Sequence, residues 1–130
     1  MDNPDLPYQP APPRSPPNDV LVVEDNYMIA IDTADMLREI GIETVRTAGS
    51  VEQALEMIAA QAPQYGLLDV NMGGEMSFTI ADHLLALGIP FAFATGYGDQ
   101  YAFPQHFSAT PMVVKPYSPE RLRTVLMGDP

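Results

Sequence analysis

Short apolar runs along the chain alternate with segments in which apolar residues recur every three or four positions. Apolar runs cover residues 20–23, 65–70, 91–94 and 112–114, and a more polar run covers 43–47. Runs of this length are typical of strands buried on both faces of a parallel sheet. The pattern therefore predicts five strands alternating with helices, joined by right-handed crossovers, with helices on both faces of the sheet.

The helical segments begin and end at residues that favour helix termini. The first follows Asp25 and Asn26, either of which can cap it, and stops at Gly41. In the second, Ser50 and Gln53 resemble a capping box. The apolar positions of the four predicted helices are Ile29, Thr33, Leu37 and Ile40; Val51, Ala54, Leu55 and Ile58; Ile80, Leu84, Leu85 and Leu87; and Leu122 and Val125. These spacings predict amphipathic helices that pack on the sheet.

Two stretches near the predicted strands lack helical spacing. Residues 96–111 contain two glycines, Pro104 and Pro111, and proline interrupts helical hydrogen bonding. The helix between the fourth and fifth strands is therefore predicted to be short or irregular. Gly73 and Gly74 predict a turn after the third strand.

Proline separates the beginning of the chain from the rest. Half of the 14 prolines fall within residues 1–18, which are predicted to be a flexible tail with polyproline character. Residues 19–130 have the length of one domain. Cysteine is absent, which excludes disulfides and thiolate metal sites. No signal peptide and no apolar run approaching the ~20 residues of a membrane span is present, so a cytoplasmic protein without membrane contact is expected.

The net charge excludes one class of partner. Seventeen acidic residues against six basic ones give a formal net charge of −11. Non-specific affinity for nucleic acid comes from Lys and Arg side chains that neutralise phosphates, so nucleic acid is not an expected partner. Lysine occurs only once, as Lys115, directly after the last apolar run.

Five charged or hydroxyl-bearing residues stand at the predicted strand ends: Glu24, Asp25, Asp69, Thr95 and Lys115. In an open parallel sheet, binding sites form beyond the carboxyl ends of the strands, which share one rim. Three carboxylates placed together repel one another unless a cation is bound. Mg²⁺ suits this need, because it takes oxygen ligands and also binds phosphate, and Mn²⁺ can substitute. The lysine and the threonine would complete a site for a phosphoryl group.

Each of these residues taken alone also has an ordinary structural explanation. Glu24 or Asp25 could cap a helix, and Thr95 could belong to a turn. Asp69 is harder to explain in this way, because it interrupts the apolar run Gly-Leu-Leu-Asp-Val, where an uncompensated charge is costly. The whole set at successive strand ends therefore favours a functional site.

Four motifs, in this order, resemble those of bacterial two-component response-regulator receiver domains (CheY-like). They are VLVVEDN at 20–26, LLDVNM at 67–72, FATG at 93–96 and VVKPY at 113–117. The resemblance implies a flavodoxin-like α/β fold with a five-stranded parallel sheet in the order 2-1-3-4-5. It also implies a signalling domain that takes a phosphoryl group from a sensor histidine kinase, and whose only chemistry is its own phosphorylation and dephosphorylation.

The resemblance assigns the phosphoryl chemistry to three residues. Asp69 would be the phosphoacceptor, and Thr95 and Lys115 would hold the phosphoryl oxygens. The Lys115–Pro116 peptide would be cis.

One position departs from the family: Met112 stands three residues before the lysine, where relatives carry an aromatic residue that rotates on phosphorylation. The usual coupling between the threonine and the fifth strand is therefore not expected here.

The resemblance also indicates which residues would bind the metal and which would influence the lifetime of the phosphoryl group. Mg²⁺ would be bound by Asp25, Asp69 and the backbone carbonyl of Asn71, with Glu24 acting through water. Asn71 and Tyr97, each two residues beyond a site residue, would tune how long the phosphoryl group persists.

A more specific motif, PFAFATGYG at 90–98, resembles that of the FAT GUY subgroup of single-domain regulators in alphaproteobacteria. Some members of that subgroup act in general stress signalling. The sequence ends at 128–130, shortly after the last predicted helix, so contact with an unknown downstream protein, rather than DNA binding, is the expected output.

Other functions remain open. The domain could be a phosphate sink that drains a kinase, or a shuttle that moves phosphoryl groups between histidine kinases. A haloacid-dehalogenase-like phosphatase also uses an aspartate after a buried strand, but it needs a second aspartate two residues later, where Asn71 stands. A flavin-binding flavodoxin is less favoured still, because no hydroxyl-rich phosphate loop follows the first strand.

Overall fold

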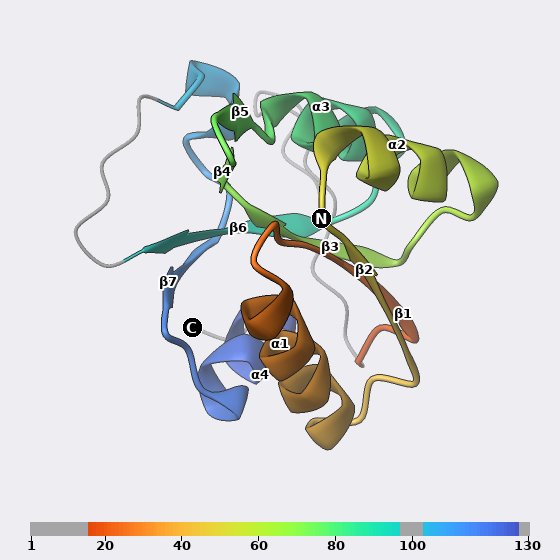
Figure 1. The fold of residues 1–130 in the computed structure, drawn as a ribbon, viewed down its shortest axis with the longest axis vertical. Coiled ribbons are helices and arrows are strands. Elements are labelled where there is room, and N and C mark those ends of the chain that lie inside the picture. Colours follow the sequence, from red (N-terminus) through yellow and green to blue (C-terminus); the bar gives the residue numbers. More distant parts are fainter. Residues whose placement is uncertain (1–15, 97–102, 128–130) are drawn as a thin grey trace, which may run out of the picture.

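A parallel sheet with helices on both faces makes up the structure, a computed structural model that describes residues 16–96 and 103–127 (Figure 1). The strands of this sheet are β1 (Asp19–Val23), β2 (Thr44–Ala48), β3 (Tyr65–Asp69), β6 (Phe91–Gly96) and β7 (Met112–Lys115). The α-helices are α1 (Tyr27–Glu39), α2 (Val51–Ala60), α3 (Phe78–Ala86) and α4 (Pro119–Met127). The sheet order β2-β1-β3-β6-β7, with every neighbouring pair parallel, confirms the predicted flavodoxin-like topology.

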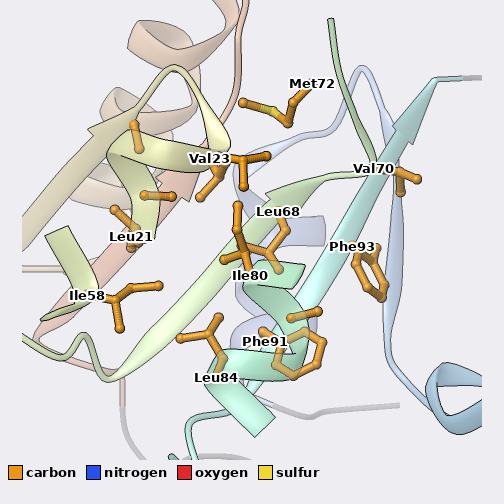
Figure 2. Close-up of a cluster of buried hydrophobic side chains, with 14 of the residues drawn as sticks. Leu21, Val23, Ile58, Leu68, Val70, Met72, Ile80, Leu84, Phe91 and Phe93 are labelled. Carbon is orange, nitrogen blue, oxygen red and sulfur yellow. The ribbon is translucent and has the colours of Figure 1, made fainter. Parts of the chain in front are cut away.

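Two apolar cores lie on opposite faces of the sheet, because successive side chains of a strand point to opposite sides. Leu21, Leu68 and Phe93 pack on one face against α2 and α3 (Figure 2). Leu67 and Val113 point to the other face, where α1 and α4 cover them. Both faces are therefore buried, as the short apolar runs predicted.

The predicted helix starts are present, with one choice resolved. The Asn26 side chain accepts a hydrogen bond from the Ile29 N–H at 3.2 Å and so caps α1. Ser50 accepts from the Gln53 N–H at 3.1 Å and caps α2. The Gln53 side chain reaches back to the Gly49 N–H, one residue before the cap, at 2.8 Å. Because Asn26 is the cap of α1, the Asp25 carboxylate is not used for this purpose.

A small hairpin follows β3, where the sequence predicted a glycine turn and then a helix. Its strands, β4 (Asn71–Met72) and β5 (Glu75–Met76), pair antiparallel. Gly73 and Gly74 join them with positive φ angles of 69° and 99°, which residues with a Cβ rarely adopt. The predicted turn is present, and the two short strands on either side of it were not predicted.

The described part of the connection from β6 to β7 contains little helix, as predicted. In its described part, 103–111, there is one 3₁₀ turn, η1 (Gln105–Phe107). Phe107 is buried, and its ring lies 5.4 Å from that of Phe93, so this turn is held by the α2–α3 core. Residues 97–102 of the connection lie outside the described residues, as does most of the predicted tail over 1–18, which stays a prediction.

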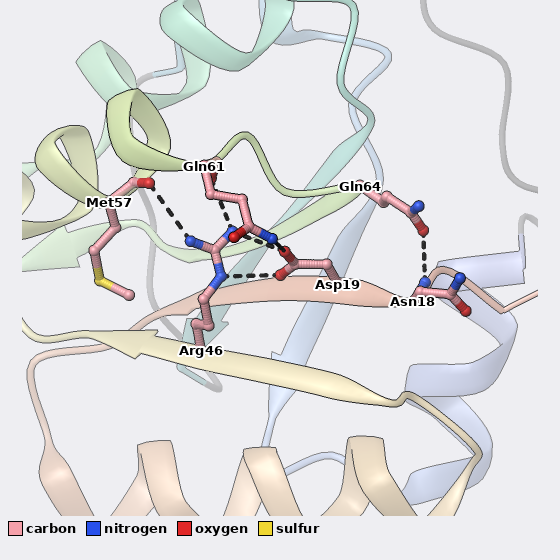
Figure 3. Close-up of polar contacts among 6 residues, drawn as sticks. All are labelled: Asn18, Asp19, Arg46, Met57, Gln61 and Gln64. Carbon is pink, nitrogen blue, oxygen red and sulfur yellow. Dashed lines mark hydrogen bonds and ion pairs between the residues drawn. The ribbon is translucent and has the colours of Figure 1, made fainter.

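Polar contacts close the opposite, amino-terminal end of the sheet (Figure 3). The Arg46 guanidinium binds both carboxylate oxygens of Asp19, at 3.0 and 3.1 Å. It also donates to the backbone carbonyl of Gln61, just after α2, at 2.9 Å. These contacts fasten the end of α2 to β1 and β2. None of the helices in the described ranges combines the length and apolar character needed to cross a bilayer.

Candidate functional site

The carboxyl ends of three strands bring Glu24, Asp69 and Lys115 together. Each stands two residues after a buried residue of the core under α1 and α4, namely Val22, Leu67 or Val113. Because residues two apart in a strand point to the same face, all three side chains lie on the α1–α4 side of the sheet. The Lys115 Nζ lies 2.9 Å from Glu24 Oε1 and 3.3 Å from Asp69 Oδ1. In the strand order, β3 lies between β1 and β6, and β7 lies next to β6. This order brings Glu24 and Lys115, which are 91 positions apart in the sequence, close enough to form an ion pair.

A third carboxylate joins this group. Glu24, Asp25 and Asp69 each offer an oxygen, and these oxygens lie within 4.8 Å of one another. Glu24 and Asp69 are 5% and 9% exposed, whereas Asp25 is exposed and opens the cluster to solvent. A set of carboxylate oxygens with one accessible side matches what Mg²⁺ requires, because Mg²⁺ takes a few carboxylates and keeps several waters. The donor set therefore fits a small divalent cation.

Burial and neighbouring charges determine the protonation states of the site. Burial, and next the negative charge of Glu24, raise the pKa of Asp69 to about 7. Burial also acts to raise the pKa of Glu24, but hydrogen bonds from Lys115 and the Asn26 N–H hold that pKa below its usual value. Burial opposes the charge of Lys115, and the two carboxylates outweigh it and raise the Lys115 pKa. Asp69 is thus the group that takes up a proton near neutral pH when no cation is bound.

This arrangement is suited to phosphoryl transfer onto a carboxylate. A cation held by the three carboxylates would supply the positive charge that keeps Asp69 ionised and neutralises phosphoryl oxygens. Lys115 already places its ammonium beside the Asp69 carboxylate, where it can bind an oxygen of an arriving phosphoryl group. Positioning and charge neutralisation are most of what such a transfer needs.

The remaining predicted site residues surround this centre unevenly. Thr95 is buried in β6, one residue beyond Ala94, the register partner of Asp69. The side chain of Asn71 accepts a hydrogen bond from the Gly74 N–H at 2.7 Å, so it is engaged in the hairpin turn. Met112 is 38% exposed and pairs in register with Phe93. Tyr97 lies outside the described residues, and the Lys115–Pro116 peptide is cis.

The sequence also matches the model of a protein family. The model of the response regulator receiver domain matches residues 20–127, which is most of the chain. The chain belongs to the response-regulator receiver family. Receiver domains are signalling domains that are phosphorylated on an aspartate, generally bind Mg²⁺, and interact with histidine kinases and downstream effectors.

Individual relatives agree with the family. The sensory transduction protein LytT of Bacillus subtilis (strain 168) is 33% identical over 111 residues, which cover 82% of this chain and 46% of LytT. The chain thus spans about half the length of that relative. The solution structure of SdrG from Sphingomonas melonis Fr1 is 34% identical, with a TM-score of 0.75 over 86% of this chain and 95% of SdrG. A structure described as the PhyR stress response regulator is 25% identical, with a TM-score of 0.69 over 83% of this chain and 43% of PhyR.

One contact beside the site involves residues that sequence reasoning did not assign to it. The Tyr117 hydroxyl lies 2.8 Å from Thr33 Oγ1, and Tyr117 stands two residues after Lys115. The apolar spacing of the first helix groups Thr33 with Ile29 and Leu37 on its apolar side. A hydroxyl residue at such a position was the available signal, because a buried hydroxyl needs a hydrogen-bond partner.

Proposed function

We propose that this receiver accepts a phosphoryl group on Asp69 from a sensor histidine kinase in a Mg²⁺-dependent reaction. The observation that carries the proposal is the position of Asp69. Its carboxylate lies at a strand end within 4.8 Å of two further carboxylates and 3.3 Å from the ammonium of Lys115. A carboxylate placed between a cation-binding cluster and an ammonium group can attack phosphorus while both positive charges neutralise the transferred oxygens.

The other roles follow from the resemblance to the family. Asp25, Asp69 and the backbone carbonyl of Asn71 bind Mg²⁺ or Mn²⁺, and Glu24 acts through a water molecule. Lys115 and Thr95 bind phosphoryl oxygens. Tyr97 and Asn71 influence the lifetime of the phosphoryl group. For Asn71, this influence passes through the hairpin turn that its side chain stabilises.

We further propose that the receiver, residues 19–130, signals by contact with another protein in the cytoplasm. The PFAFATGYG motif supports membership of the FAT GUY subgroup and a role in general stress signalling. The similarity to a protein described as a stress response regulator points in the same direction.

Incubation with acetyl phosphate, followed by intact mass measurement, tests the acceptor role. We expect the protein to gain the mass of one phosphoryl group with Mg²⁺ and none with EDTA. Asp69→Asn should abolish the gain. Asp35→Asn, which removes an exposed carboxylate on α1 whose side chain is 70% accessible, should leave it intact. Modification of Asp69→Asn, or no modification of the unaltered protein in Mg²⁺, would refute the assignment.

A further inference from the structure

A pair of hydroxyl groups joins helix α1 to the segment that follows the site lysine. Tyr117 Oη and Thr33 Oγ1 lie 2.8 Å apart, at hydrogen-bond distance, although they are 84 positions apart in the sequence. Thr33 is only 1% exposed, so its hydroxyl needs a partner inside the protein. The pair therefore ties together two elements that are not consecutive in the chain.

Tyr117 lies where the chain has just left the sheet. Strand β7 is at the edge of the sheet and ends at Lys115, with β6 as its neighbour. Helix α4 begins only at Pro119. Pairing with β6 thus restrains Lys115 on one side, and the hydroxyl pair restrains the turn of residues 116–118 that follows it.

Packing alone does not fill the space between α1 and this turn. A pocket of about 410 Å³ lies there, and its lining includes Thr33 and Met36 from α1 and Lys115 and Tyr117 from the other side. Met36 and Tyr117 also pack against the α1–α4 core, but because the space between the two walls is open, this packing restrains their distance only in part. The hydrogen bond between the hydroxyl groups is a direct link from one wall to the other.

A lysine side chain is a flexible four-carbon stem that ends in a point charge, so the position of the Lys115 ammonium depends on how firmly its backbone is held. We propose that Tyr117 is a positioning residue, which holds the Lys115 ammonium beside Asp69 through its hydrogen bond to Thr33. The consequence for phosphoryl transfer rests on the proposed function of Asp69. The consequence for the position of Lys115 does not depend on it.

The phenol acts on the site through geometry rather than through its own charge. Burial raises the pKa of Tyr117, so the group is a neutral hydroxyl at neutral pH. The charges of Glu24, Lys115 and Asp69 also influence its pKa, which places the phenol within electrostatic reach of all three. Replacing tyrosine by phenylalanine therefore removes a hydrogen bond and leaves the net charge of the site unchanged.

The chain offers a direct way to observe the lysine. Lys115 is the only lysine, so its ammonium group gives a single ¹H–¹⁵Nζ signal in NMR spectra that needs no assignment among lysines. We expect Tyr117→Phe and Thr33→Val each to increase the mobility of Nζ, seen as a lower order parameter and faster exchange of its protons with water. Thr33→Ser, which keeps a hydroxyl group, should restore values close to those of the unaltered protein.

A second measurement follows the rate of phosphorylation by acetyl phosphate in saturating Mg²⁺. Loss of one hydrogen bond that orients a reacting partner should slow phosphorylation by roughly threefold to tenfold. The affinity for Mg²⁺ should be unchanged, because neither hydroxyl belongs to the acidic cluster. The double variant should be no slower than the slower single variant, because both substitutions remove the same bond.

Tyr65→Phe is the matched control. It removes a phenol hydroxyl from the same α1–α4 core, where Tyr65 donates to the Val125 carbonyl at 3.5 Å, at the opposite end of β3 from Asp69. It should leave both the Lys115 signal and the rate unchanged. Should Tyr117→Phe fail to fold, Thr33→Val tests the same bond from α1.

The outcomes separate this inference from the proposed function. An unchanged Lys115 signal, or an unchanged phosphorylation rate, in a folded variant lacking either hydroxyl would overturn the positioning role. An equal effect of Tyr65→Phe would also overturn it, because the effect would then reflect general loosening. No phosphorylation of the unaltered protein would instead refute the acceptor role of Asp69, and the Lys115 signal would still decide the question of position.

Discussion

Asp69 places a carboxylate where ionisation is costly. It is 9% exposed, and Glu24 brings a second negative charge to the same space. Lys115 compensates in part, but its ammonium is closer to Glu24, at 2.9 Å, than to Asp69, at 3.3 Å. A functional site can retain such a residue because a bound cation would relieve the repulsion between the carboxylates.

The burial of Asp69 and its repulsion by Glu24 predict a pH-dependent stability difference between the unaltered protein and Asp69→Asn. The pKa of Asp69 rises from 3.8, its ordinary value, to about 7 in the folded state, so the folded state binds more protons between these values. The free energy of unfolding should therefore fall as pH rises through this window. Asparagine cannot ionise, so Asp69→Asn should be more stable than the unaltered protein at pH 8, by roughly 1–3 kcal/mol, and equal to it below pH 4.

Urea unfolding in EDTA at pH 4, 6 and 8 measures this difference. Asp35→Asn removes an exposed carboxylate and serves as the control, which should follow the pH dependence of the unaltered protein. Parallel stability curves for Asp69→Asn and the unaltered protein would show that Asp69 does not resist ionisation in the folded state.

At the scale of elements, the Leu84 side chain of helix α3 packs directly against strand β3 at Gly66. A Cβ atom added to Gly66 would meet Leu84 Cδ1 at 2.7 Å, closer than real Cβ contacts allow. Leu84 is fully buried in the α2–α3 core, so it has little room to move. The absence of a Cβ atom at Gly66 therefore leaves room for Leu84 to pack against the strand that carries Asp69.

Gly66→Ala should consequently destabilise the protein by about 1–3 kcal/mol, the usual cost of overfilling a packed core. Gly49→Ala is the matched control: a Cβ there would come no closer than 3.8 Å to Gln53, so the change should be small. Thermal or urea unfolding of the two variants gives the comparison. Equal stabilities would mean that Leu84 adapts without cost.

At the scale of the whole molecule, the site exists only where strands from distant parts of the chain converge. Glu24 and Asp25 follow β1, Asp69 ends β3 and Lys115 ends β7, so the folded state alone assembles the acidic cluster that we propose binds a divalent cation. A ligand that binds only the folded state stabilises it by mass action. Metal binding and global stability are therefore linked.

We expect Mg²⁺ to raise the free energy of unfolding, by about 2.7 kcal/mol at a concentration 100 times the dissociation constant. Asp25→Ala should abolish most of this gain while leaving the metal-free protein folded, because Asp25 is exposed. Potassium chloride at matched ionic strength controls for screening of the net charge of −11. Equal stabilisation by both salts would argue against a specific site.

Much of the fold could be predicted because its signals are local. The apolar runs at 65–70 and 91–94 correspond to β3 and β6, and Ser50 caps α2 as its spacing to Gln53 indicates. The convergence of Asp69 and Lys115 could also be predicted, because every parallel strand ends at the same rim. The hairpin β4–β5 could not, since strands of two residues carry almost no periodic signal.

The sequence by itself determined which residues stand at the strand ends and that their chemistry is carboxylate, hydroxyl and ammonium. The tertiary structure alone decided that Asn26 rather than Asp25 caps α1, that Lys115 contacts Glu24 as well as Asp69, and that Tyr117 reaches Thr33. The reason is the range of the forces involved. Hydrophobic spacing and turn preferences depend on near neighbours in the chain, whereas hydrogen bonds between side chains depend on tenths of an ångström that only the packing of the whole molecule determines.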